Sequence, residues 1–124
     1  MDVTPLIPAD RQVIDSYGAT SFRVSGVAYD GAILVFPDAT LAWPATSMAE
    51  VTAVSLAPVT SHGAVEILLI GCGKKMVPVP RALRQTLREA GIVVDTMDTG
   101  AACRTYNILL AEDRRVAAAL LPAG

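Results

Sequence analysis

The residues best suited to chemistry form two clusters, each directly after a predicted buried strand. The first cluster, the glycine loop, comprises Gly71, Cys72, Gly73, Lys74 and Lys75. The second, at the start of a helical pattern, comprises Asp98, Thr99 and Arg104. A glycine loop at the end of a strand offers backbone N–H groups, and lysines add positive charge. The first cluster is therefore suited to hold an anion or the carboxylate of a partner.

A nucleotide site is a more specific alternative for the glycine loop, and the spacing argues against it. Both the dinucleotide fingerprint G-x-G-x-x-G and the P-loop require a glycine at the position of Met76. Asp95, at the end of the next predicted strand, does lie where a ribose-binding acid would be. Because two glycines after a strand are also ordinary turn chemistry, the sequence favours a turn, and we expect no cofactor.

The two clusters are expected to meet. The carboxyl ends of parallel strands open toward one edge of a sheet, and ligands bind in the crevice there. In this interpretation Asp98, Thr99, Cys103 and Arg104 are the polar contributors beside the glycine loop. In the simpler alternative, which the residue types favour, Asp98 or Thr99 caps a helix and Arg104 is exposed.

The sequence contains few of the residues that other catalytic or metal-binding sites require. Cys72 and Cys103 form no C-x-x-C pair, although both fall near the predicted crevice. The single histidine, His62, precedes the strand and so lies at its opposite end from Cys72. No zinc-like spacing and no nucleophile triad can be assembled. We therefore expect buried, inert cysteines, no metal, and a protein that is not an enzyme.

Composition limits the class of protein. The 124 residues are 52% hydrophobic and 18% charged, which suits one domain with one core. A net charge of −2 argues against a general nucleic-acid binder. Without a secretory signal or an apolar run long enough to cross a bilayer, a cytoplasmic location without a membrane span is expected.

Charge is distributed unevenly along the chain. Residues 66–124 hold eight basic and six acidic side chains, whereas residues 1–65 hold two and six. The positive excess gathers at Lys74, Lys75, Arg81, Arg84 and Arg88. A solvated helix face with a loop is the simpler interpretation, and an anion or partner site is the alternative.

Residues 1–65 form a β-rich part of a single domain that spans 1–124. The expected features are a strand over Ser21–Tyr29 bent at Gly26, a hairpin turn at Asp30-Gly31, a buried strand over Ala32–Phe36, a turn over Pro37–Thr40 and a strand from Leu41 to Pro44. Ser47 and Glu50 have the spacing of a capping box, which predicts a short helix toward Leu56. Thr60–Gly63 is expected to be a polar loop.

Residues 66–124 show a strand–helix–strand–helix–strand pattern. Strands are predicted over Val65–Ile70, Ile92–Val94 and Val116–Leu121. Helices are predicted from Pro80 to a stop at Gly91, and from the Asp98–Thr99 cap to about residue 112. This alternation is typical of a parallel sheet with right-handed crossovers, so the fold class is α/β. The N-terminal hairpins must add antiparallel strands or a second small sheet.

Several short motifs together resemble one family. They are the Gly-x-Gly loop, Gly91-Ile92, Met97-Asp98-Thr99 and Thr105-Tyr106-Asn107, and the N-terminal SFRVSGVAYDGAILVFPDATLAW is also similar. The family is a small single-domain one, spread from archaea to humans, that includes mitochondrial complex I (NADH:ubiquinone oxidoreductase) assembly factor 3 and the adipogenesis-associated domain-containing protein. The resemblance covers about residues 6–122. The loop is usually Gly-Thr-Gly in this family, whereas this chain has Cys72 in place of the threonine.

The resemblance implies a three-layer α/β fold with a mixed, mostly parallel central sheet and an additional N-terminal antiparallel β layer. It implies no established catalysis. Because the sequence shows no transit peptide, a bacterial member of the family is expected. Its expected role is that of an assembly factor or scaffold for respiratory complex I or membrane-protein biogenesis, with respiratory-complex subunits or other assembly factors as partners. The alternatives are an anion or small-molecule binder, or an enzyme, at the crevice, and a homo-oligomer that pairs through strand edges.

Overall fold

The structure of the protein, a computed structural model, describes residues 10–124. Its first half contains β1 (Ile14–Tyr17), β2 (Ser21–Val24), β3 (Val27–Asp30), β4 (Ile33–Phe36), β5 (Ala39–Ala42), a 3-10 helix η1 (Met48–Glu50) and α1 (Ala57–His62). Its second half contains β6 (Ile67–Gly71), α2 (Arg81–Glu89), β7 (Val93–Met97), α3 (Thr99–Ala111) and β8 (Val116–Leu120).

The central sheet has five strands in the order β5-β4-β8-β6-β7. Strand β6 runs parallel to both β7 and β8, while β4 is antiparallel to β8 and to β5. The predicted α/β class with a mixed sheet is confirmed. The sequence predicts that the N-terminal hairpins either add antiparallel strands to the central sheet or form a second small sheet, and they do both. Strands β4 and β5 extend the central sheet, whereas β1, β2 and β3 form a separate antiparallel sheet, the small sheet.

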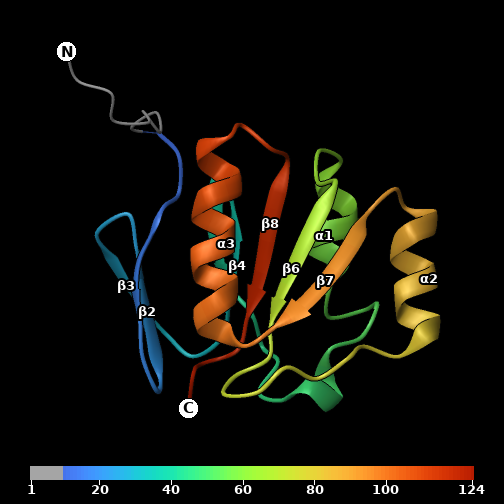
Figure 1. Ribbon diagram of the computed structural model, residues 1–124, viewed down its shortest axis with the longest axis horizontal. Helices are drawn as coiled ribbons and strands as arrows, with labels where there is room; N and C mark the ends of the chain where they lie inside the picture. Colours follow the sequence, from blue (N-terminus) through green and yellow to red (C-terminus); the bar gives the residue numbers. More distant parts are fainter. Residues whose placement is uncertain (1–9) are drawn as a thin grey trace.

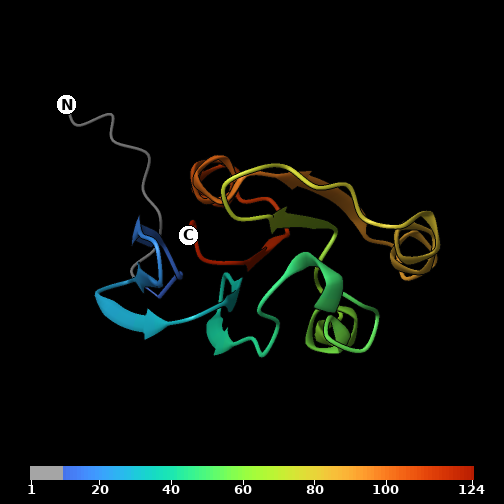
Figure 2. The same ribbon diagram turned by 90° about the horizontal axis from the view of Figure 1, so that it is seen from below.

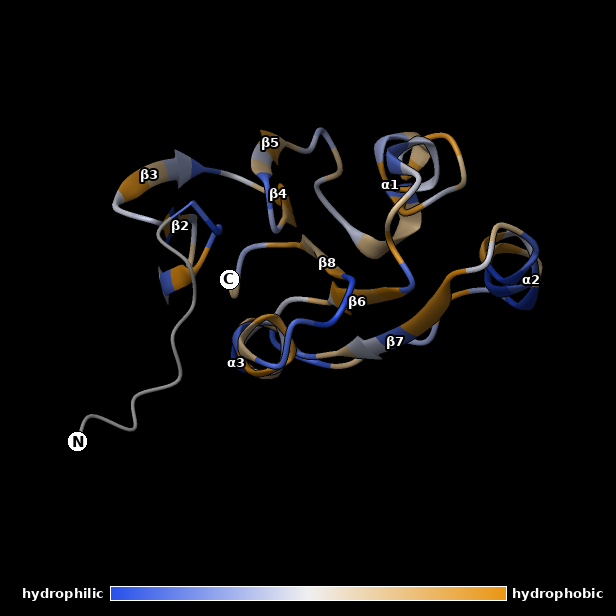
Figure 3. Ribbon diagram, turned by 90° about the horizontal axis from the view of Figure 1, so that it is seen from above, coloured by the Kyte–Doolittle hydropathy of each residue, from blue (hydrophilic) through white to orange (hydrophobic). Residues whose placement is uncertain are grey.

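The molecule is layered around the central sheet (Figures 1 and 2). Helix α3 and the small sheet lie on one face, and α1 lies on the other with α2 beside β7 (Figure 3). Successive side chains along each strand point to opposite faces of the sheet. In β4, Leu34 joins the core with Trp43, while Ile33 joins the core with Tyr106 of α3. Both faces of the sheet are therefore covered, which explains why β4, β6 and β8 are almost wholly apolar.

The predictions for both long helices are confirmed. Helix α2 presents Leu83 and Leu87 to the core and is followed by Gly91 at φ 82°. Helix α3 begins after Asp98, whose Oδ1 accepts a hydrogen bond of 2.9 Å from the N–H of Ala101. These signals are local to the chain, so they could be recognised without knowledge of the fold.

Two predictions for residues 21–31 are wrong. The expected single bent strand is a hairpin of β2 and β3, because Ser25 and Gly26 both adopt positive φ (46° and 82°) and reverse the chain. The expected hairpin turn at Asp30-Gly31 instead carries the chain from β3 of the small sheet to β4 of the central sheet.

The prediction for residues 47–63 is also wrong. The capping-box helix is only the one turn of η1, and Glu50 accepts a hydrogen bond from the Thr46 N–H (2.7 Å) rather than pairing with Ser47. Helix α1 occupies much of the expected polar loop instead. It has Pro58 in its first turn and ends at Gly63, which adopts φ 85°.

The exposed edge of the central sheet at β7 is partly covered by α2. The guanidinium of Arg84 donates a hydrogen bond of 2.9 Å to the carbonyl oxygen of Val94. An unpaired edge strand otherwise offers such groups to another chain. Arg84 therefore restrains strand addition at this edge, which bears on the predicted homo-oligomer.

Candidate functional site

The glycine loop and the start of α3 meet at the carboxyl ends of β6 and β7, as predicted. The hydroxyl of Thr99 accepts a hydrogen bond from the Gly73 N–H (2.8 Å) and donates one to the Leu121 carbonyl (2.6 Å). The Thr99 N–H in turn donates to the Gly73 carbonyl at 2.9 Å. Thr99 is fully buried. This one side chain joins the glycine loop, α3 and the segment after β8.

The two glycines of the loop have separate structural reasons. A Cβ on Gly71 would lie 2.9 Å from Leu120 Cδ2 and 3.1 Å from Thr99 Cα, so only glycine fits without displacement. Gly73 has φ 91°, a conformation that side-chain-bearing residues rarely adopt. Packing and backbone geometry thus account for both glycines without a ligand.

Several backbone donors that could bind an anion already have partners in the protein. The Cys72 N–H donates to the Met97 carbonyl (2.8 Å), the Gly73 N–H to Thr99, and the Ala101 N–H to Asp98. The loop also presents to solvent the exposed side chains of Lys74 and Lys75. The backbone N–H groups of Cys72, Gly73 and Ala101 are therefore not free to hold an anion at this loop.

Both cysteines are buried, as predicted. The Cys72 thiol lies 3.4 Å from the Val77 carbonyl, and burial raises its pKa. Burial in the α3 core raises the pKa of Cys103 to about 12. Since the thiolate is the nucleophile, burial and the raised pKa both disfavour reaction of these thiols at neutral pH. Within residues 10–124, no three His, Cys, Asp or Glu side chains are grouped closely enough to hold a metal ion.

Arg104 has its hydrogen-bonding partner in β1 rather than in the glycine loop. Its Nη1 lies 3.2 Å from the hydroxyl of Tyr17. Asp15, Tyr17, Cys103, Arg104 and Asn107 contribute to a shallow hollow of about 360 Å³ between β1 and α3. Asp98 and Thr99 thus meet the glycine loop, whereas Arg104 faces the small sheet.

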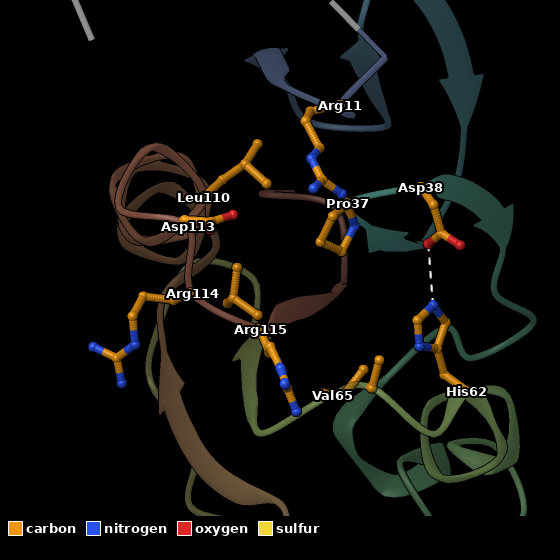
Figure 4. A pocket seen from close by; sticks show the side chains of 11 residues that line it. Arg11, Pro37, Asp38, His62, Val65, Leu110, Asp113, Arg114 and Arg115 are labelled. Atoms are coloured by element: carbon orange, nitrogen blue, oxygen red, sulfur yellow. Dashed lines mark hydrogen bonds and ion pairs between the residues drawn. The ribbon is translucent and has the colours of Figure 1, made fainter. Parts of the chain in front are cut away.

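A second hollow, of about 340 Å³, lies at the opposite end of the central sheet (Figure 4). Sequence reasoning did not find it, because its residues come from four separate segments. The charged and aromatic side chains that line it are Arg11, Asp38, His62, Asp113, Arg114 and Arg115. Arg115 is paired with Glu66 at 3.3 Å.

His62 in this hollow has a structural role. Its ring stacks on Phe36 at 4.7 Å between centroids, and its Nε2 lies 3.0 Å from Asp38 Oδ1. That hydrogen bond is the main cause of the lowered pKa of Asp38. The other nitrogen, Nδ1, is buried without a partner in the described chain. The pair therefore links α1 to the β4–β5 turn.

The fold and the site together place the protein in the class of small, layered α/β domains. Its Thr99, Asp98 and His62 side chains form hydrogen bonds within the domain, and its two cysteines are buried. No helix in residues 10–124 has both the length and the apolar character needed to cross a membrane. The chain belongs to the family described as "Protein of unknown function (DUF498/DUF598)", which matches residues 14–121. The family resemblance inferred from the sequence is thereby confirmed.

Three relatives show the range of the family. The uncharacterized protein RCAP_rcc01784 of Rhodobacter capsulatus is 37% identical over 88% of this chain and 83% of its own. NADH dehydrogenase [ubiquinone] 1 alpha subcomplex assembly factor 3 is 33% identical in Danio rerio, over 89% of this chain, and 30% in Homo sapiens, over 92%. This chain spans only 64% and 62% of those two proteins.

Solved structures show the same fold. A Bartonella henselae structure described as an outer membrane protein has a TM-score of 0.85 at 39% identity, covering 92% of this chain and 97% of its own. A Bordetella pertussis protein described as an Mth938-like domain has a TM-score of 0.84 at 31% identity, covering 100% of this chain and 94% of its own.

Proposed function

We propose that this protein is a non-enzymatic assembly factor that acts in the cytoplasm through contacts with subunits of respiratory complex I or with other assembly factors. The observation that carries the proposal is the 30–33% identity, over about nine-tenths of this chain, to relatives named complex I assembly factor 3. The alignments extend over 111 and 115 residues of this chain, so the similarity is not confined to a short motif.

The geometry supports contact with partners over catalysis. Thr99 is committed to three backbone groups, and His62 Nε2 is paired with Asp38. The thiols of Cys72 and Cys103 are buried with raised pKa values. A domain whose reactive groups stabilise its own fold offers partners its surface instead.

Co-purification tests this proposal. The tagged chain is isolated from gently solubilised native membranes, and the recovered proteins are identified by mass spectrometry. Subunits of complex I or other assembly proteins should be enriched over a tag-only control. They should also be enriched over the Gly71→Asp variant, which is expected to disrupt the packing of the glycine loop against Thr99. Recovery of the same proteins at the same level in the control would contradict the proposal.

A further inference from the structure

The segment from Ile67 to Arg88 is unusual in its charge. Its 22 residues include five basic side chains and no acidic one, in a chain whose net charge is −2. Three of these five cations, Lys74, Lys75 and Arg81, are exposed and lie in the loop after β6 or at the first residue of α2, which that loop joins (Figure 1). We call this region the basic loop face, and it is made of Lys74, Lys75, Met76, Val77 and Arg81.

The cations of this face are not used within the protein. Among the described residues, no ion pair involves Lys74, Lys75 or Arg81. All three are exposed. Asp98, at the start of α3, caps that helix and forms no ion pair with these cations. The positive charge of the face is therefore available to an external anionic group.

Apolar side chains lie between these cations. Met76 is 56% exposed and Val77 is 40% exposed, although large apolar side chains are usually buried. The loop is anchored on both sides, by the buried Cys72 before them and the buried Val79 after them. The loop therefore holds Met76 and Val77 outward, between the lysines and Arg81.

We propose that the basic loop face binds a bilayer surface rich in anionic phospholipid. Lysines beside exposed apolar side chains suit such an interface, where cations attract the headgroups and the apolar groups enter the boundary of the acyl chains. Two of the three cations of the face are lysines, and a lysine is a flexible point charge that fits a fluid surface, whereas recognition of a shaped carboxylate favours the rigid fork of arginine. This role is independent of the proposed assembly function.

Co-sedimentation of the purified full chain with vesicles tests the proposal. One vesicle is phosphatidylcholine alone, and the other is an equal mixture of phosphatidylcholine and phosphatidylglycerol. We expect binding to the mixture only, weakened by salt. Lys75→Glu should reduce affinity at least about tenfold. Arg114→Glu, an equal charge reversal on an exposed residue at the opposite end of the sheet, should leave affinity unchanged.

The apolar contribution separates a lipid surface from an acidic protein. Met76→Ser should weaken binding to the mixed vesicles while thermal stability remains that of the wild type. The proposal is overturned by no binding to the mixture, or by equal losses in Lys75→Glu and Arg114→Glu. It is also overturned if Met76→Ser binds normally and polyglutamate displaces the protein, since the site would then recognise an acidic chain. The assay uses only the purified protein, so its failure leaves the proposed assembly function unaffected.

Discussion

The side chain of Asn107 pairs with the backbone of Ile14 as a neighbouring strand would. Its Oδ1 accepts a hydrogen bond from the Ile14 N–H (3.0 Å), and its Nδ2 donates one to the Ile14 carbonyl (2.8 Å). The adjacent Tyr106 donates from its hydroxyl to the Gln12 carbonyl at 3.0 Å. The Thr-Tyr-Asn motif therefore fixes the small sheet to α3.

Asn107→Ala should lower the free energy of unfolding by about 2 kcal/mol, because two backbone groups of Ile14 lose their partners. Urea denaturation measures the loss, and hydrogen exchange should show faster exchange at the Ile14 amide. Ile108→Ala, at an exposed position one residue further, should change stability by less than about 0.5 kcal/mol. Equal stability of both variants would show that the pairing is dispensable.

Thr99→Val keeps the shape of the side chain but removes its hydroxyl. The Gly73 N–H and the Leu121 carbonyl would each lose a partner in a buried place. We expect a loss of about 3 kcal/mol in the free energy of unfolding. Thr99→Ser, which retains the hydroxyl, should recover most of this loss. If serine were as damaging as valine, the methyl group rather than the hydrogen bonds would be responsible.

Gly71→Ala should destabilise the protein by about 1–3 kcal/mol, because the new methyl group would be forced against Leu120 and the Thr99 backbone. Gly18→Ala is the matched control, since its nearest neighbour would be 3.8 Å away and its φ is not positive. Thermal unfolding of the two variants compares them directly, and similar melting temperatures would refute the packing explanation.

The Asp38–His62 link gives stability a component that depends on pH. The hydrogen bond from His62 lowers the folded-state pKa of Asp38 below its ordinary value of 3.8. The stabilisation that this hydrogen bond gives the folded state is fully present at pH values above 3.8. It is lost as the pH falls through the lower pKa that Asp38 has in the folded state. Asp38→Asn should therefore be less stable than the wild type at neutral pH, and the gap should close in acid. A gap that stays constant with pH would exclude this linkage.

Because both thiols are buried, they are expected to react slowly with reagents in solution. In the native protein at neutral pH, Cys103, with a pKa of about 12, should react with an aromatic disulfide reagent at least about a hundredfold more slowly than in denaturant. The variants Cys72→Ala and Cys103→Ala isolate each thiol. Rapid labelling of native Cys103 would mean that α3 opens readily or that the thiol has another role.

The second half of the chain was predicted well because its signals are local. Asp98 caps α3 and Gly91 ends the α2 turn through contacts within a few residues. Residues 21–63 were predicted less well. Ser25 in a positive-φ turn has no strong signature, and the destination of β4 depends on β8, more than 80 residues later in the chain.

The candidate site was predicted only in part, for a similar reason. The order of parallel strands is sufficient to bring the glycine loop to Thr99. It does not reveal that the Thr99 hydroxyl would occupy the Gly73 N–H, or that Arg104 would face Tyr17. The pairing of His62 with Asp38 joins residues 24 apart in different elements, and no spacing rule indicates it.

The assembly role is tested most directly by deletion of the gene in its own organism. The measured quantity is the amount of assembled complex I, read from native gels and from NADH oxidation by membranes. The proposal predicts that both fall, and that the wild-type gene restores them whereas Thr99→Val restores them less. An unchanged level of assembled complex I after deletion would contradict the proposal.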